Sequence, residues 1–234
     1  MTKNVLKIIT VFIIGVIGGI FADQILWPYF IERPLFLEYR LEQTPVYLTE
    51  VREIYIQESV ALQKSVEKVD KVVVGLRIET ETGKTLVGSG LIVTSDGLVL
   101  TLAKFLPKNS EVTLFFDGQE FTPQILRIKD DLALLKIEGG NLPTVSFADF
   151  EKTKLGQRVF LVGAFFDKRK LGKMVNEGTV RYFDESLIQT NIFDDLEGSI
   201  LFDIEGNVLG LNTVNQEGRI SALPVSELKK FLGF

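Results

Sequence analysis

A long apolar segment near the N-terminus is the strongest feature of the hydrophobic pattern. Residues 8–31 are mostly apolar, with one short polar interruption. A helix of about 20 such residues crosses the ~30 Å hydrocarbon layer of a membrane. Lys3 and Lys7 precede the segment, whereas Asp23 and Glu32 follow its apolar stretches. Because positive charge stays on the cytoplasmic side, we expect a single-pass helix with a cytoplasmic N-terminus and an extracytoplasmic main domain.

A cleaved signal peptide is the competing interpretation of the same segment. A charged start and an apolar stretch suit both, but no A-x-A cleavage pattern follows Ala22. We therefore expect residues 1–31 to form a short cytoplasmic tip and an uncleaved transmembrane anchor. Residues 32–57 are expected to form a linker. Residues 58–234 are expected to form the folded domain.

Short β runs divided by turns fill the folded domain. Residues 58–69 show the spacing of a short amphipathic helix, and residues 225–232 predict a closing helix. Between them lie two successive groups of about six strands, at about 71–140 and 143–224. Several hairpin turns carry the expected turn residues: Asp96-Gly97, Asp117-Gly118 and Glu205-Gly206-Asn207. Without helices between the strands, the pattern indicates an all-β fold, either paired barrels or a sandwich.

The 234-residue chain contains neither cysteine nor histidine, which excludes several kinds of chemistry. No disulfide or cysteine nucleophile can form, and no imidazole can act as a general base. A Ser-His-Asp hydrolase is therefore excluded before the fold is considered. The net charge of −5 gives no reason to expect nucleic-acid binding. Asp194, Asp195 and Glu197 lack the alternation of a calcium-binding loop, so we expect no metal and no cofactor.

Several segments resemble HtrA-type, trypsin-like serine proteases. The run GSGLIVTSDGLVLT at residues 88–101 resembles a first-barrel segment of that family, and DLALLKIE from Asp131 resembles the segment with its catalytic aspartate. LGQRVFLVGAFF and NEGTVRYF resemble second-barrel strands, and GNVLGLNT from Gly206 resembles a strand beside the nucleophile loop. The resemblance covers about residues 58–234. It implies two six-stranded antiparallel β-barrels with the active site between them, and we expect no PDZ domain before Phe234.

The resemblance also places the catalytic triad of the family on this chain. Lys104 falls on the histidine position, and Asp131 falls on the aspartate position, which is retained. Aligning backward from GNVLGLNT places Glu197 on the nucleophile. A slip of one or two residues would instead bring Ser199 to the nucleophile position. No triad is therefore intact, and Ser199 remains as a displaced candidate nucleophile.

The chemistry of these residues predicts a loss of hydrolysis. A serine hydroxyl needs a base within hydrogen-bond reach, and a lysine base must be neutral. Asp131 and Glu197 favour a protonated Lys104 instead, so the three residues are expected to form an ion-paired cluster. Gly88-Ser89-Gly90 lacks the spacing of a nucleophile elbow and is interpreted as strand structure.

We therefore expect an inactive, membrane-anchored pseudoprotease that binds a peptide or protein, or acts as a scaffold. The alternative is an active serine endopeptidase that uses Ser199 with Lys104. The expected partners are the membrane, through the N-terminal helix, and a protein or peptide ligand. Members of this family often form trimers, so the resemblance also implies that a homo-oligomer is possible.

Overall fold

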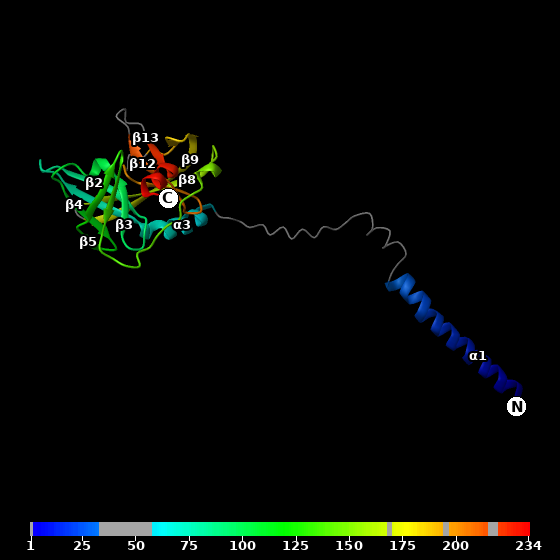
Figure 1. Cartoon of the computed structure of the whole chain (residues 1–234). Helices are drawn as coiled ribbons and strands as arrows, with labels where there is room; N and C mark the ends of the chain where they lie inside the picture. The colour runs from blue at the N-terminus through cyan, green and yellow to red at the C-terminus, as the bar shows by residue number, and fades with distance from the viewer. Residues whose placement is uncertain (1, 33–57, 168–169, 194–196, 215–219) are drawn as a thin grey trace. The chain divides into compact units, whose positions relative to one another are not determined.

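The computed structural model describes residues 2–32, 58–167, 170–193, 197–214 and 220–234 (Figure 1). The expected linker lies almost wholly outside these ranges. The chain divides into two compact units, Met1–Tyr55 and Ile56–Phe234. The first contains the helix α1 (Thr2–Phe21), which continues as a π-helical segment, η1 (Ala22–Glu32).

The apolar N-terminal helix is long enough to cross a membrane. Lys3–Trp27 form a 25-residue span with a mean hydropathy of 2.5. Exposed isoleucine, valine and phenylalanine side chains suit contact with lipid rather than with water. A signal sequence can have the same length and composition, so the helix by itself does not separate a membrane anchor from a cleaved signal sequence.

The first group of strands forms a curled seven-stranded sheet in the order β5-β4-β1-β2-β3-β7-β6. Its strands are β1 (Val73–Glu79), β2 (Thr85–Ile92), β3 (Leu98–Leu102), β4 (Glu111–Phe116), β5 (Gln119–Phe121), β6 (Gln124–Lys129) and β7 (Leu132–Lys136). Each neighbouring pair is antiparallel. The sheet has one strand more than expected, and β5 and β6 are its two edges.

The extra strand arises where one expected strand divides in two. The sequence pattern predicts a single strand at residues 120–128, but Thr122 and Pro123 separate β5 from β6. Proline has no backbone N–H and cannot donate to a ladder, so the pairing is interrupted there. The first half then pairs with β4 and the second half with β7.

The second group of strands forms a closed six-stranded barrel, as predicted, in the order β10-β13-β12-β11-β8-β9. Its strands are β8 (Arg158–Asp167), β9 (Lys170–Phe183), β10 (Ile188–Thr190), β11 (Ile200–Asp203), β12 (Val208–Val214) and β13 (Ile220–Pro224). Figure 1 shows β8, β9, β12 and β13 beside the strands β2 to β5 of the first sheet. The all-β fold of two packed, barrel-like sheets is therefore confirmed.

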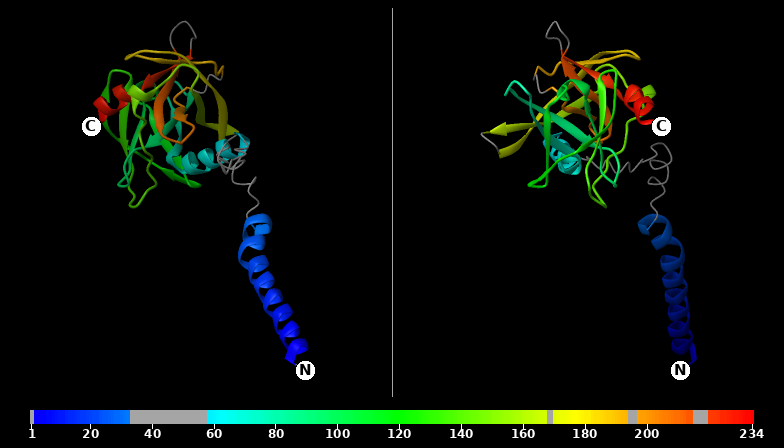
Figure 2. Two further views of the ribbon diagram at one scale, coloured as in Figure 1. Left: turned by 90° about the vertical axis from the view of Figure 1, so that its right-hand side faces the viewer. Right: turned by 60° about the vertical axis from the view of Figure 1, so that its left-hand side comes forward.

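Two helices cover the sheets, at the residues that the sequence pattern predicted. The helix α3 (Glu58–Val69) ends at the β11–β12 turn, where Ser65 Oγ donates to the carbonyl of Ile204. The helix α4 (Val225–Leu232) buries Leu228 and Phe231 in the main core. Figure 2 shows α3 (cyan) across one end of the domain and α4 (red) on its flank.

A buried serine joins the two sheets. Ser89 lies in β2 and is 1% exposed, and its Oγ accepts a hydrogen bond of 2.8 Å from the backbone N–H of Ala164 in β8. The carbonyl of Ser89 accepts from Thr101 Oγ1 at 2.8 Å. Gly88 and Gly90 on either side leave no room for a Cβ atom. The Gly88-Ser89-Gly90 motif is therefore strand structure, as predicted, and also an inter-sheet contact.

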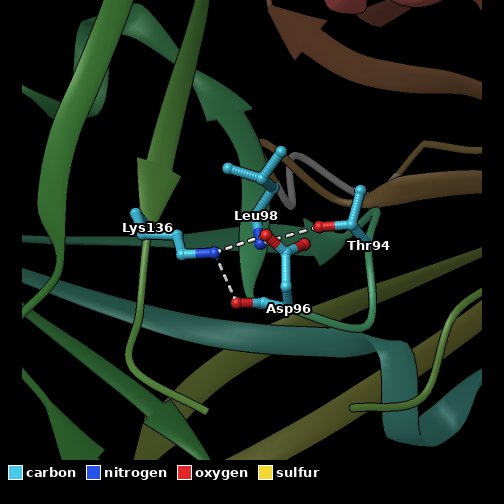
Figure 3. A network of polar contacts seen from close by, with 4 residues as sticks. All are labelled: Thr94, Asp96, Leu98 and Lys136. Carbon is cyan, nitrogen blue, oxygen red and sulfur yellow. Dashed lines mark hydrogen bonds and ion pairs between the residues drawn. The ribbon is translucent and has the colours of Figure 1, made fainter. Parts of the chain in front are cut away.

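The β2–β3 turn contains the polar network in Figure 3. Lys136 Nζ from β7 contacts the carboxylate of Asp96 at 2.6 Å, and Leu98 N donates to Thr94 Oγ1 at 3.1 Å. Gly97 has a φ of +100°, a conformation that favours glycine, and a Cβ there would lie 2.4 Å from the carbonyl of Ile137. The hydrogen bond from Lys136 is the main reason that the pKa of Asp96 lies below its ordinary value.

We expect the Lys136→Met variant to be less stable than the wild-type protein near pH 7. Because the pKa of Asp96 is lowered on folding, its stabilisation is complete above the ordinary value of 3.8 and is lost as the pH falls below it. The difference in melting temperature between the two proteins should therefore shrink below about pH 4. A difference that stays constant from pH 7 to pH 3 would contradict this assignment.

Candidate functional site

The pairing of β3 with β7 brings Lys104 and Asp131 to the same end of the first sheet. Leu102, the last residue of β3, is opposite Leu132, the first residue of β7. A 3-10 turn, η3 (Ala103–Phe105), carries Lys104 beyond this pair. The N–H of Ala103 donates to the carbonyl of Asp131 at 2.8 Å, which fixes the two segments side by side.

Strand β12 holds the loop that contains Glu197 and Ser199. The N–H of Gly198 donates to the carbonyl of Asn212 at 2.9 Å, and Asn212 N donates to the carbonyl of Ser199 at 2.8 Å. The N–H of Val214 donates to Glu197 Oε1 at 3.1 Å. These three bonds fix the loop immediately before β11. They also occupy the N–H of Gly198, which is therefore not available to bind an oxyanion.

An ion pair joins the two sides of the site. Lys104 Nζ contacts Glu197 Oε1, and the side chains are 40% and 28% exposed respectively. The carboxylate of Asp131 is exposed and lies outside ion-pair distance of Lys104. The prediction that Lys104, Asp131 and Glu197 form one ion-paired cluster is therefore wrong for Asp131. This residue acts on Lys104 only through its longer-range charge.

The pKa of Lys104 is shifted downward from its ordinary value. Partial burial of the ammonium lowers this pKa, and the negative charge of Asp131 acts in the opposite direction. Burial therefore outweighs the charge of Asp131, which corrects the expectation that the carboxylates alone decide the direction. Direct contact with a carboxylate favours the protonated amine, so we interpret Lys104–Glu197 as a charged pair near pH 7.

Ser199 is fully buried, and its hydroxyl has no hydrogen-bond partner within the described part of the chain. Lys104 is thus not positioned as its base. The preceding Gly198 has a φ of +78°, and a Cβ there would lie 2.5 Å from the ring of Phe105. Phe105 is 5% exposed, and the same ring packs on Gly88 of the first sheet. The ring therefore fills the space between β2 and the Glu197–Ser199 loop.

This arrangement can bind charge, and within the described residues Ser199 and Lys104 do not form a nucleophile–base contact. Acyl transfer needs a nucleophile in contact with a base, and donors aimed at the developing oxyanion. Here the lysine contacts a carboxylate, and the buried hydroxyl contacts neither. No three acidic, histidine or cysteine residues gather as a metal site among the described residues. Asp194 and Asp195 lie outside those residues.

Sequence reasoning missed two parts of the site. It gave Phe105 no role, although its ring separates the sheets at this point. It also missed the bond from Val214 N to Glu197. The only sequence signal for the role of Phe105 was an aromatic residue directly after the histidine position. No sequence signal existed for the hydrogen bond between Val214 N and Glu197.

We expect the Lys104–Glu197 pair to contribute a small, salt-sensitive stabilisation. Because both side chains are partly exposed, the coupling free energy should be about 0.2–1 kcal/mol. Unfolding of Lys104→Ala, Glu197→Ala and the double variant by urea gives this coupling directly. It should decrease in 1 M NaCl. A coupling of zero at low salt would show that the pair does not hold the two sides together.

Two packed barrel-like sheets, with this site between η3 and the loop before β11, define the trypsin-like class of fold. The chain matches the family described as "Trypsin-like peptidase domain" over residues 88–211, which is more than half of its length. The protein therefore belongs to the trypsin-like peptidase domain family.

Curated relatives narrow the similarity to the HtrA type. A probable periplasmic serine endoprotease DegP-like of Halomonas elongata is 31% identical over 139 residues, covering 54% of this chain and 29% of that protein. Its counterpart in Pseudomonas putida (strain W619) is 33% identical over 139 residues, covering 54% and 28%. Serine protease HTRA1 of Xenopus tropicalis is 32% identical over 164 residues, covering 62% and 35%. The chain thus matches only about a third of the length of these relatives.

Proposed function

We propose that this protein is a membrane-anchored, extracytoplasmic, HtrA-like pseudoprotease that binds peptide or protein segments without cleaving them. Residues 1–31 act as the anchor, residues 32–57 as the linker and residues 58–234 as the binding domain. The domain needs no cofactor and no metal in this role. Extended segments bind along a strand edge, where main-chain hydrogen bonds provide affinity for many sequences.

The observation that carries this proposal is the ion pair between Lys104 and Glu197. These residues occupy the positions that the family resemblance gives to the base and the nucleophile. A protonated lysine that is paired with a carboxylate has no lone pair to accept the proton of a serine hydroxyl, so it cannot act as the general base. In a comparable protease, loss of the base or the nucleophile alone lowers kcat by about 10⁶-fold.

The extracytoplasmic location rests on two observations. The apolar helix Lys3–Trp27 has Lys3 and Lys7 at its N-terminal end and Asp23 near its C-terminal end, with Glu32 beyond it. Several relatives are named as periplasmic proteins. Membrane anchorage distinguishes this proposal from a secreted form, in which the same helix would be a cleaved signal peptide. The mass of the mature chain in isolated membranes decides between the two.

The second candidate function is a serine endopeptidase that uses Ser199 with Lys104. The downward shift of the Lys104 pKa favours it, because a lysine base must lose its proton. The missing contact between Ser199 Oγ and Lys104 disfavours it. The pseudoprotease is therefore the better supported of the two.

One titration with a fluorescein-labelled unfolded protein tests binding and cleavage together. The full chain in detergent micelles should raise the fluorescence anisotropy to a plateau, while the labelled protein stays intact on a gel after overnight incubation. An unchanged anisotropy would contradict the binding role. Fragments that disappear with both Ser199→Ala and Lys104→Ala would establish the endopeptidase instead.

A further inference from the structure

Strand β6 is an exposed apolar edge of the first sheet. It pairs with β7 on one side only and ends the seven-stranded order. All six of its residues are exposed, and three of them are large and apolar: Ile125 at 46%, Leu126 at 47% and Ile128 at 48%. An edge strand of this kind presents free backbone donors and acceptors beside apolar side chains.

The pairing with β7 shows which side chains share a face. Ile125 is opposite Leu135 and Ile128 is opposite Ala133, and both partners are buried in the core. Residues 133 and 135 are two apart in β7, so they point to the same face of the sheet. Ile125 and Ile128 therefore also share that face. The register shift between Ile125 and Arg127 places Leu126 at a bulge, which explains why two residues three apart point the same way.

The opposite face of β6 carries its charges. Arg127 is opposite Leu134 and Lys129 is opposite Leu132. The guanidinium of Arg127 lies 4.4 Å from the centre of the Phe231 ring and donates to the carbonyl of that residue. This contact holds Arg127 against α4 and away from the Ile125 and Ile128 face.

We propose that β6 pairs in antiparallel fashion with β6 of a second copy of this chain. The two-fold axis passes between Leu126 and Arg127. This register sets Ile125 opposite Ile128 of the other copy, and the symmetry repeats that contact. Four isoleucines then gather on one face, and the sheets of the two copies become one continuous sheet.

The charges of β6 are compatible with this register. Each Lys129 is opposite an uncharged Gln124, and each Arg127 is opposite Leu126. No like charges are opposed, although the strand carries two cations and no anion. A second copy in any register that opposed Arg127 or Lys129 to its own counterpart would be destabilised by charge repulsion. Several antiparallel registers avoid such repulsion, but only this one opposes Ile125 to Ile128.

The interface is small, so the association should be weak in solution. Six residues from each copy cover well below the area of about 1,200 Å² that stable complexes need. We expect a dissociation constant of the order of 10⁻⁴ M for the domain alone. Anchors in one membrane would raise the effective concentration and make the pairing significant. This inference does not depend on whether the chain hydrolyses peptides.

Cysteine cross-linking tests the register directly, because the chain contains no cysteine of its own. We would mix full-length Ile125→Cys and Ile128→Cys proteins in detergent micelles or vesicles under mild oxidation. Opposed residues of an antiparallel pair lie about 4.5–5.5 Å apart at Cα, which is within disulfide range. In an Ile125→Cys homodimer the two thiols would instead be about 10 Å apart along the strands, which is beyond that range. The mixed dimer should therefore form at least about ten-fold faster than either homodimer.

Two controls keep the outcome decisive. Leu155→Cys, which is placed at an exposed loop position, measures random collision. An added Ile125→Lys or Ile128→Lys change on β6 should abolish the mixed cross-link, and circular dichroism shows whether the variant remains folded. Equal rates for all cysteine pairs, or cross-links no faster than at residue 155, would overturn the proposal. If β6 instead binds a peptide from another protein, the cross-links at residues 125 and 128 would also form no faster than those at residue 155.

Discussion

Replacing Phe105 by alanine lowers the free energy of unfolding by about 3–5 kcal/mol, which is the usual cost of removing a buried phenylalanine ring. The ring is 5% exposed and contacts both Gly88 of β2 and Gly198 of the loop before β11. Its loss leaves a cavity between the two sheets that the rigid backbone on either side cannot fill. Urea unfolding at 25 °C measures the change.

Phe105→Leu is the matched control for this prediction. Leucine retains most of the apolar volume and should cost clearly less than alanine. The Lys104–Glu197 coupling should also weaken in Phe105→Ala, because the ring packs against both Gly88 and Gly198 and so supports the loop beside Lys104. A loss below about 1 kcal/mol would show that the space between the sheets is not filled as described.

Replacing Ser199 by alanine raises the free energy of unfolding by about 1 kcal/mol. A buried hydroxyl without a partner has lost its hydration and gained no hydrogen bond, so its removal relieves that cost. Ser199 is fully buried, and its Oγ has no partner among the described residues. The melting temperature of Ser199→Ala should therefore be higher than that of the wild-type protein.

Ser89→Ala is the matched control: it makes the same chemical change as Ser199→Ala but should lower the free energy of unfolding. Its Oγ accepts from the N–H of Ala164, so Ser89→Ala leaves a buried donor unpaired and should cost about 1–3 kcal/mol. Stabilisation by Ser199→Ala together with destabilisation by Ser89→Ala would support an inert Ser199. Destabilisation by both would show that Ser199 has a partner.

The sequence predicted those parts of the fold that depend on local signals. The helices at Glu58–Val69 and Val225–Leu232 follow from apolar spacing, and both have the predicted bounds. The closed second barrel followed from strands, turns and family resemblance. The division of β5 from β6 was missed, although Pro123 signals it, because apolar residues continue on both sides.

The sequence predicted which residues lie near the site, but not all of the contacts that their side chains make. Placing Lys104 and Glu197 together needed the family resemblance, and the structure brings them into an ion pair. The same resemblance brought Asp131 near, but local side-chain geometry leaves its carboxylate exposed. The role of Phe105 depends on contacts with Gly88 and Gly198, so the aromatic residue after the histidine position was a signal too weak to reveal it.

Reaction with a fluorophosphonate tests most directly whether the site is inactive. The reagent forms a covalent phosphonyl ester with an activated serine and releases fluoride, and intact-mass spectrometry detects the adduct. The full chain in detergent micelles would be compared with Ser199→Ala, with trypsin as the positive control. The proposal predicts no adduct on the folded protein. A stoichiometric adduct that is absent from Ser199→Ala would contradict it and establish an activated Ser199.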